Sequence, residues 1–128
     1  MTKKTEIGNL GENLACEFLE NKKYRIIERN FRRKYGEIDI IARTKDGIIV
    51  FVEVKTMREI NDLKPEDNLT DAKLKKIKRT ASVYAGENQK LIKDKKGWRI
   101  DLIAITTLTN NLKYGDKKSY RIYHYENI

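Results

Sequence analysis

Residues 36–56 read GEIDIIARTKDGIIVFVEVKT, a pattern of two β-strands joined by a short turn. The two segments, Glu37–Ala42 and Ile48–Thr56, are rich in the Ile and Val residues that strands favour. Between them, Lys45-Asp46-Gly47 supplies the residues of a tight turn. The sequence therefore predicts a β-hairpin, and the length of its turn fixes which residues face each other.

The position of Asp39 depends on that turn length. A two-residue Asp46-Gly47 turn would pair Asp39 with Val54 and point its carboxylate away from Glu53. A three-residue turn, with Gly47 in the left-handed conformation, would set Asp39 directly opposite Glu53, with β-carbons about 5 Å apart. Two carboxylates that close repel each other unless a cation lies between them or one of them is protonated.

Two cations could balance this pair of acids: a hard divalent metal ion, or Lys55. Strand alternation places Lys55 on the same face as Glu53, roughly 7 Å away. The simpler interpretation of an isolated Glu-x-Lys pair is a weak ion pair on a solvent-facing strand. Asp39 favours a functional site, because an acid between Ile38 and Ile40 is costly without a role or a partner.

The rest of the chain predicts an α/β fold of order αβββαββ. Apolar residues at helical spacing indicate helices, and alternating segments indicate strands. The expected helices are Ile7–Asn21 and about Thr70–Ala85; the expected strands are Tyr24–Phe31, Glu37–Ala42, Ile48–Thr56, Gly97–Ile105 and Ser119–Glu126. Thr70 or Asn68 is the expected N-cap of the second helix and Gly86 its stop, with a loop over Met57–Asp67 and a polar turn over Asn110–Lys118. We expect a single domain over residues 1–128.

Composition limits the function classes. The 128 residues contain 28 Lys and Arg against 19 Asp and Glu, a net charge of +9, which points to a polyanionic partner. One cysteine, Cys16, and one histidine, His124, exclude an internal disulfide and a His/Cys zinc cluster and leave a carboxylate-bound metal. The longest strongly apolar run, Ile48–Val52, is far below the roughly 18 residues of a membrane helix. With no secretory signal in the N-terminal residues, we expect no membrane partner and a cytoplasmic location.

Several motifs together resemble a known nuclease family. Asp39 and Glu53-Val-Lys55, preceded by Gly8-x-x-Gly-Glu12-x-x-Ala15, resemble the metal-dependent PD-(D/E)XK nuclease core, although Ile38 stands where the superfamily has proline. Gly36-Glu-Ile-Asp-Ile-Ile, Phe51-Val-Glu-Val-Lys-Thr and Arg99-Ile-Asp101 are similar to the bacterial YraN-type proteins, which are described as similar to archaeal Holliday-junction resolvases. The resemblance covers about Ile7 to Ile105. It implies a restriction-endonuclease-like core, a mixed central sheet of about five strands flanked by helices, with a metal site and DNA as substrate.

The resemblance also implies roles for individual residues. Asp39 and Glu53 would bind Mg²⁺ (or Mn²⁺), which prefers hard oxygen ligands, and Lys55 would orient or deprotonate the attacking water. Glu12 would be a third ligand or hold a second metal; the alternative is an ordinary acid at the edge of the helix. Lys73 would contact phosphate beside the metal; the alternative is a lysine whose stem packs on apolar surface while its ammonium reaches water.

Other polar residues are assigned weaker or structural roles. Lys73, Lys75, Lys76, Arg32 and Arg33 are the expected phosphate contacts, although Lys-rich surfaces also serve solubility. Asp101 is expected to pair with Arg99 or with backbone of a neighbouring strand. Cys16 and His124 are expected to be structural, and Glu37 is not expected to bind metal because it lies near the start of its strand.

The function predicted from these features is a metal-dependent DNA endonuclease, selective for branched or junction DNA. The symmetry of such a substrate favours a homodimer. One alternative is a nucleic-acid-binding module that retains the nuclease fold without chemistry. Another is an adaptor in which Asp39, Glu53 and Lys55 form only an ion-pair network.

Overall fold

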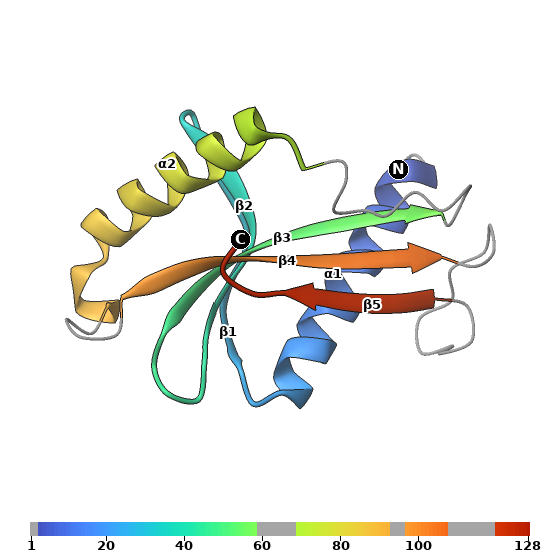
Figure 1. Ribbon diagram of the computed structural model, residues 1–128, viewed down its shortest axis with the longest axis horizontal. Coiled ribbons are helices and arrows are strands. Elements are labelled where there is room, and N and C mark those ends of the chain that lie inside the picture. Colours follow the sequence, from blue (N-terminus) through green and yellow to red (C-terminus); the bar gives the residue numbers. More distant parts are fainter. Residues whose placement is uncertain (1–2, 59–68, 93–96, 108–119) are drawn as a thin grey trace.

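The computed structural model describes residues 3–58, 69–92, 97–107 and 120–128. The helices are α1 (Lys3–Asn21) and α2 (Asp71–Glu87), with a short 3₁₀ helix η2 (Gln89–Leu91) after α2. The strands are β1 (Arg25–Arg33), β2 (Gly36–Arg43), β3 (Ile49–Arg58), β4 (Trp98–Thr107) and β5 (Tyr120–Tyr125). Figure 1 shows these elements as one sheet with a helix on either side.

The sheet is mixed and follows the order β1-β2-β3-β4-β5. Neighbouring strands are antiparallel except β3 and β4, which are parallel, and α2 forms the crossover between them. Parallel neighbours need such a crossover because a tight turn cannot join them. The predicted α/β class, the mixed sheet and the order αβββαββ are confirmed, consistent with a restriction-endonuclease-like core.

Each helix buries its apolar stripe against a different face of the sheet. The cluster under α1 contains Leu14, Ala15, Cys16, Leu19, Ile40, Ala42, Val50, Val52, Ile103 and Ile105. The cluster under α2 contains Phe31, Ile38, Ile41, Ile49, Phe51, Ile77, Ala81, Tyr84 and Ile100. On β3, Val50 and Val52 therefore face α1 while Ile49 and Phe51 face α2, which is the period-two alternation of a strand buried on both sides.

The boundaries differ from the predicted ones at several element ends. The strand β3 continues to Arg58, where Met57 was predicted to begin a loop. The helix α2 runs through Gly86 to Glu87, so the prediction that Gly86 stops it is wrong. Asn88 caps it instead, because its backbone N–H donates to the carbonyls of Tyr84 and Ala85. Thr70 is the N-cap, as predicted, and its hydroxyl accepts the Lys73 N–H. The alternative cap Asn68, the rest of the predicted loop and the predicted turn at 110–118 lie outside the described residues.

A polar network joins β4 and β5 on the α1 side of the sheet. Asp101 is fully buried and accepts hydrogen bonds from Arg99 Nε (2.9 Å) and the Asn127 N–H (3.0 Å), and His124 Nε2 lies 2.7 Å from it. Phe18 and Tyr24 meet the His124 ring edge-on, both with centroids 6.0 Å away. Asp101 thus pairs with Arg99, as predicted, and the network ties the last strand to the end of α1.

None of the helices in the described part of the chain is both long and apolar enough to cross a membrane.

Replacing Asp101 by Asn should destabilise the fold. Burial alone would raise the pKa of Asp101, but the bonds from His124, Arg99 and Asn127 outweigh burial and hold that pKa below its usual value. We expect Asp101→Asn to lower the free energy of unfolding by about 3 kcal/mol at pH 7, because the Arg99 charge loses its buried partner. Urea unfolding measures the change.

The matched control is Glu126→Gln, since Glu126 also contacts Arg99 (3.4 Å) but is largely exposed, and we expect it to cost under about 1 kcal/mol. Because the pKa of Asp101 is lowered on folding, its contribution is present at neutral pH and is lost as the pH falls below about 4. Equal effects of both variants at pH 7 would contradict this account of the network.

Candidate metal centre

The turn between β2 and β3 has the three-residue form. The recorded pairs run from Ile40–Val52 to Arg43–Ile49, which is the register predicted for a three-residue turn. The Gly47 N–H donates to the Thr44 carbonyl at 3.0 Å. Gly47 has a positive φ of +95°, a backbone conformation that glycine adopts more readily than other residues. In this register Asp39 lies opposite Glu53, one step beyond the last recorded pair.

The sheet is irregular at Asp39. A regular strand would turn Ile38 and Ile40 to one face, but Ile38 packs in the cluster under α2 and Ile40 in the cluster under α1. On the neighbouring strand Asn30, which falls opposite Asp39, has φ of +53°. The Val54 N–H donates to Asp39 Oδ2 at 2.8 Å, so the carboxylate takes a backbone donor at the end of the ladder.

The charges of the two acids are offset in different ways: Asp39 has a raised pKa, and Glu53 pairs with Lys73. Burial, followed by the nearby charge of Glu53, raises the pKa of Asp39 to about 7, although the Val54 hydrogen bond opposes the shift. The side chain of Glu53 is 10% exposed, and its Oε1 lies 2.7 Å from Lys73 Nζ. The hydrogen bond to Glu53 raises the pKa of Lys73, which therefore stays charged.

A raised carboxyl pKa and a lysine thus both reduce the repulsion between the two acids. The lysine that pairs with Glu53 is Lys73. Lys55 is half-buried two residues along β3, and within the described parts of the chain it forms no ion pair with a carboxylate. The interpretation in which Lys55 neutralises the acids is wrong for this arrangement, because α2 brings Lys73 onto Glu53 instead. The predicted role of Lys55 toward water stays a prediction.

Glu12 reaches the same region from α1. A side chain at Gly11 would collide with the Thr56 hydroxyl, so glycine lets α1 lie directly on β3. The Glu12 side chain is 14% exposed, and its Oε2 is buried with no hydrogen-bond donor among the described residues. Arg29 Nη2 is 3.8 Å from it. Burial raises the pKa of Glu12 despite the Arg29 charge, and the charge of Glu12 in turn contributes to the raised pKa of Asp39.

These three carboxylates fit a hard divalent ion in their chemistry. They are oxygen ligands, and Glu12 Oε2, whose contact with Arg29 is a long ion pair rather than a hydrogen bond, is a buried acceptor that a cation would satisfy. Their oxygens do not all lie within 4.8 Å of one another, however. Among the described residues the group that does is Asp101, His124 and Glu126, where Arg99 already pairs with both carboxylates and supplies the positive charge.

A cavity of about 480 Å³ opens beside Glu53, between α2 and the start of β2. A side chain at Gly36 would collide with the Thr80 hydroxyl, so α2 packs close to β2 here. The lining residues are Gly36, Glu37, Glu53, Thr70, Ala72, Lys73, Lys76, Ile77 and Thr80. Two of the predicted phosphate contacts, Lys73 and Lys76, therefore border the cavity that contains Glu53.

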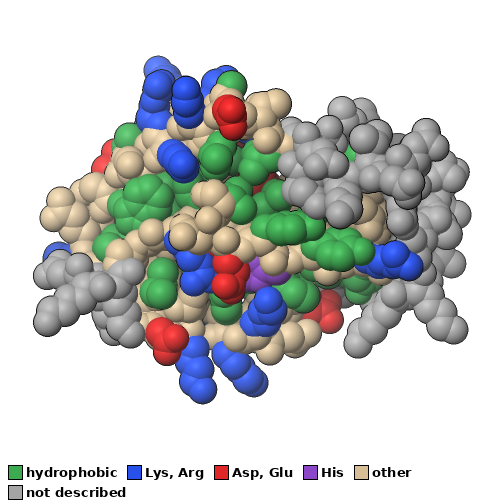
Figure 2. All heavy atoms as spheres, in the orientation of Figure 1, with side chains coloured by type: hydrophobic (Ala, Val, Ile, Leu, Met, Phe, Trp, Pro, Cys, Tyr) green, Lys and Arg blue, Asp and Glu red, His purple; other side chains and the backbone are tan. Residues whose placement is uncertain are grey.

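The other predicted phosphate contacts are exposed and do not line this cavity. Lys75 is exposed on α2 and does not line the cavity. Arg32 pairs with Glu37 at 2.9 Å, and Arg33 lies over the Phe31 ring at 4.3 Å. Figure 2 shows Lys and Arg side chains gathered at the top of the view, over α2 and the neighbouring hairpin. Glu37 is thus an exposed ion-pair partner of Arg32, and the prediction that it does not bind metal stays a prediction.

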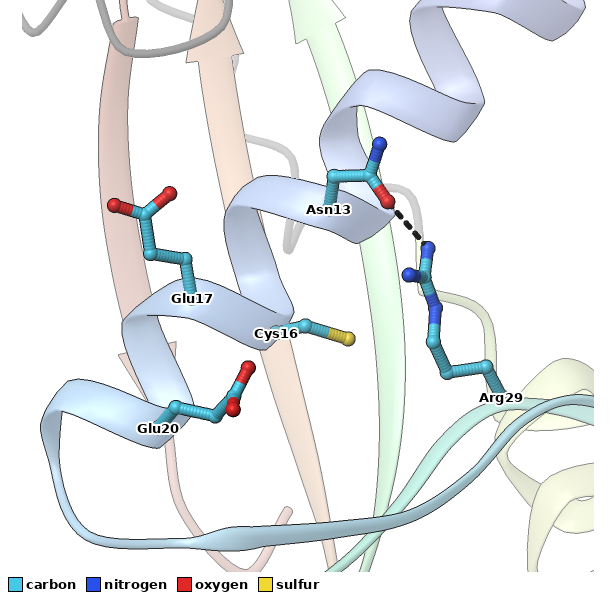
Figure 3. Close-up of a pocket in the computed structure, with 5 residues that line it drawn as sticks. All are labelled: Asn13, Cys16, Glu17, Glu20 and Arg29. Carbon is cyan, nitrogen blue, oxygen red and sulfur yellow. Dashed lines mark hydrogen bonds between the residues drawn. The ribbon is translucent and has the colours of Figure 1, made fainter.

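A second hollow, of about 290 Å³, lies between α1 and β1 (Figure 3). Arg29 donates to Asn13 Oδ1 at 2.7 Å across it, and this bond holds the guanidinium near Glu12. Burial raises the pKa of the Cys16 thiol, so Cys16 is a poor nucleophile and is buried in the helix as predicted. Sequence reasoning missed Arg29 as a neighbour of Glu12, because no local pattern links residues of α1 and β1.

The sequence also matches known proteins. Residues 11–105 match the family described as uncharacterised protein family UPF0102. A UPF0102 protein from Clostridium botulinum (strain Loch Maree / Type A3) is 42% identical over 112 residues, covering 88% of this chain and 89% of the relative. One from Sulfurihydrogenibium sp. is 39% identical over 124 residues, covering 97% and 94%. One from Dictyoglomus turgidum is 40% identical over 100 residues, covering 78% and 81%.

The raised pKa of Asp39 predicts that the metal-free protein loses stability as the pH rises. Because the folded-state pKa of about 7 exceeds the usual 3.8, folding favours the protonated carboxyl, and the cost of ionising it grows between about pH 4 and pH 8. Asp39→Asn removes that cost while an amide oxygen still accepts the Val54 N–H. With a chelator present, the free energy of unfolding of the variant minus that of wild type should increase by on the order of 2 kcal/mol from pH 5 to pH 8. Thermal unfolding across this range measures it, and a difference independent of pH would contradict the assignment.

Proposed function

The chain belongs to the UPF0102 family, the YraN-type family that its motifs resemble, and we propose that it is a metal-dependent DNA endonuclease selective for branched substrates. The observation that carries the proposal is the closeness of the Asp39 and Glu53 side chains, just beyond the last β2–β3 pair, where the charge of Glu53 contributes to the raised pKa of Asp39. A carboxyl group with a raised pKa beside Glu53, which pairs with Lys73, forms a site that a divalent cation would stabilise.

Asp39 and Glu53 would hold Mg²⁺ or Mn²⁺, and Glu12 would supply a further oxygen from α1. Such an ion makes bound water more acidic and offsets negative charge that develops on a phosphate. The protein's part is to keep these acids close and largely buried, where electrostatic interactions are stronger than in water. Arg29 limits the repulsion between Glu12 and the other two acids.

Two lysines complete the proposed machinery. Lys55 follows Glu53 on the same face of β3 and would orient the water that attacks phosphorus in line with the leaving oxygen. Lys73 pairs with Glu53 in the metal-free protein and borders the cavity. Once Glu53 binds a cation, the Lys73 ammonium would be free to contact a substrate phosphate and the charge that develops on it.

The substrate is proposed from charge and shape. The net charge of +9 and the exposed cations on α2 and the β1–β2 hairpin favour a phosphate backbone. None of the described elements resembles a base-reading helix-turn-helix or zinc finger, so we expect recognition of backbone shape rather than of sequence.

One observation favours the alternative of a binding module without chemistry. The Lys73–Glu53 contact at 2.7 Å satisfies Glu53 without a metal. In that case Asp39 and Glu53 would be structural, and substitution of either acid would leave DNA binding intact. The two functions are separated by whether a metal ion binds and whether DNA is cut.

A specific metal site should raise thermal stability. A ligand that binds only the folded state adds about 2.7 kcal/mol when its concentration is 100 times its Kd. We expect Mn²⁺ or Mg²⁺ at saturating concentration to raise the melting temperature of wild type by several degrees and that of Glu53→Gln by little. Glu37→Gln, which alters an exposed acid on β2, is the matched control and should respond like wild type. An identical metal response in all three proteins would exclude Glu53 as a ligand.

Cleavage itself is tested with end-labelled four-way junction, flap, duplex and single-stranded DNA in Mg²⁺ or Mn²⁺. We expect wild type to cut a branched substrate in preference to duplex. Glu53→Gln, Asp39→Asn and Lys55→Met should each lose about 100-fold or more, because each removes a group that acts on the reacting phosphate or water.

Glu37→Gln should cut at the wild-type rate and serves as the control for surface charge. Lys73→Met should lose activity while binding metal at least as tightly as wild type, since it no longer competes for Glu53. Binding of DNA without cutting in either metal would reject the nuclease and leave the binding module.

A further inference from the structure

The tip of the β1–β2 hairpin carries an exposed aromatic ring. Arg33 pairs with Gly36, so Lys34 and Tyr35 form the two-residue turn between them. Tyr35 is 37% exposed, one of two large apolar side chains described as exposed. No other described residue hydrogen bonds to its hydroxyl or stacks on its ring. Turns of this kind usually carry Gly, Asn, Asp, Pro or Ser, so local folding does not explain a tyrosine here.

The tip is positively charged. Arg32, Arg33 and Lys34 precede Tyr35, and the one acid beside it, Glu37, pairs with Arg32, which leaves a net charge of +2. Arg33 is held over the Phe31 ring and donates to the Arg32 carbonyl. An exposed ring flanked by cations is the arrangement with which proteins bind single-stranded nucleic acid, where bases stack and phosphates are neutralised.

The hairpin is fixed against α2, so the ring has a stable position. Gly36 lies directly on Thr80, and the Phe31 ring meets Tyr84 edge-on with centroids 5.2 Å apart. Figure 1 shows the end of this hairpin rising beside α2. Stacking of a base on this ring would contribute to the binding free energy without the entropy cost of ordering a loop.

The tip also borders the candidate metal centre. Gly36 and Glu37, which directly follow Tyr35, line the same cavity as Glu53 and Lys73. A strand whose base stacks on Tyr35 could therefore lead its phosphates along Lys76 and Lys73 toward the paired carboxylates.

We propose that Tyr35 is a stacking platform for an unpaired nucleobase and that the β1–β2 hairpin tip selects DNA in which a base is free at a branch. This inference rests on the proposed DNA function and adds the feature that distinguishes branched from fully paired DNA. A fully paired duplex offers no free base face to the ring except at its ends.

The test measures binding, with Ca²⁺ in place of Mg²⁺, to flap DNA that carries 2-aminopurine at its first unpaired position and to a paired duplex of the same length. We expect Tyr35→Ala to weaken flap binding about tenfold, the effect of losing one base–aromatic stack, and to leave duplex binding unchanged. Wild type should quench 2-aminopurine fluorescence, and Tyr35→Ala should not. Tyr35→Phe keeps the ring and should behave like wild type.

The matched control is Tyr123→Ala, which removes the other exposed aromatic side chain, on β5. Equal binding of flap DNA by wild type and Tyr35→Ala, or equal losses on flap and duplex, would overturn the platform, as would the absence of DNA binding by wild type. A selective Tyr35 effect without any cutting in Mg²⁺ or Mn²⁺ would support the platform and reject the nuclease. Metal-dependent cutting whose rate and substrate preference are the same in Tyr35→Ala as in wild type would support the nuclease and reject the platform.

Discussion

The register between β2 and β3 determines which charges meet in this protein. The three-residue turn ending at Gly47 puts Asp39 opposite Glu53, and a slip of one residue would turn one of these carboxylates to the other face of the sheet. The same register leaves the Val54 N–H for Asp39 and turns Glu53 toward Lys73 of α2. Burial is the largest cause of the raised pKa of Asp39, and the charge of Glu53, brought close by this alignment, is the next.

The parts of the site that lie within one hairpin could be predicted from the sequence. Turn length and strand alternation are local properties, so residues 36–56 alone narrow the register to two alternatives, one of which sets Asp39 opposite Glu53. The partner of Glu53 could not be predicted in this way. Lys73 lies on a helix that reaches the sheet through a crossover, and helix periodicity gives its face but not the strand residue it meets.

The irregular backbone at Asp39 was also beyond sequence reasoning. Ile38 and Ile40 look like members of one apolar face, yet they pack under different helices. The left-handed Asn30 on β1 is part of this strand irregularity, and a single asparagine in a strand gives only a weak signal of it.

The end of α2 also differs from the sequence prediction. Gly86 has the residue type that commonly ends a helix, but the hydrogen bonds of Asn88 place the end of α2 after Glu87.

A comparison of the half-buried Asp39 with the fully buried Asp101 argues that the Asp39 site exists for binding rather than for stability. Asp101 aligns with Val52 in the sheet, one residue from Glu53, and receives four hydrogen bonds from Arg99, His124 and Asn127, which hold its pKa low. The fold can therefore satisfy an internal acid at this depth. Asp39 receives one backbone donor and faces a second carboxylate, and its pKa is raised. Leaving Asp39 in that state costs folding free energy at neutral pH, and a bound cation is the simplest interaction that would recover it.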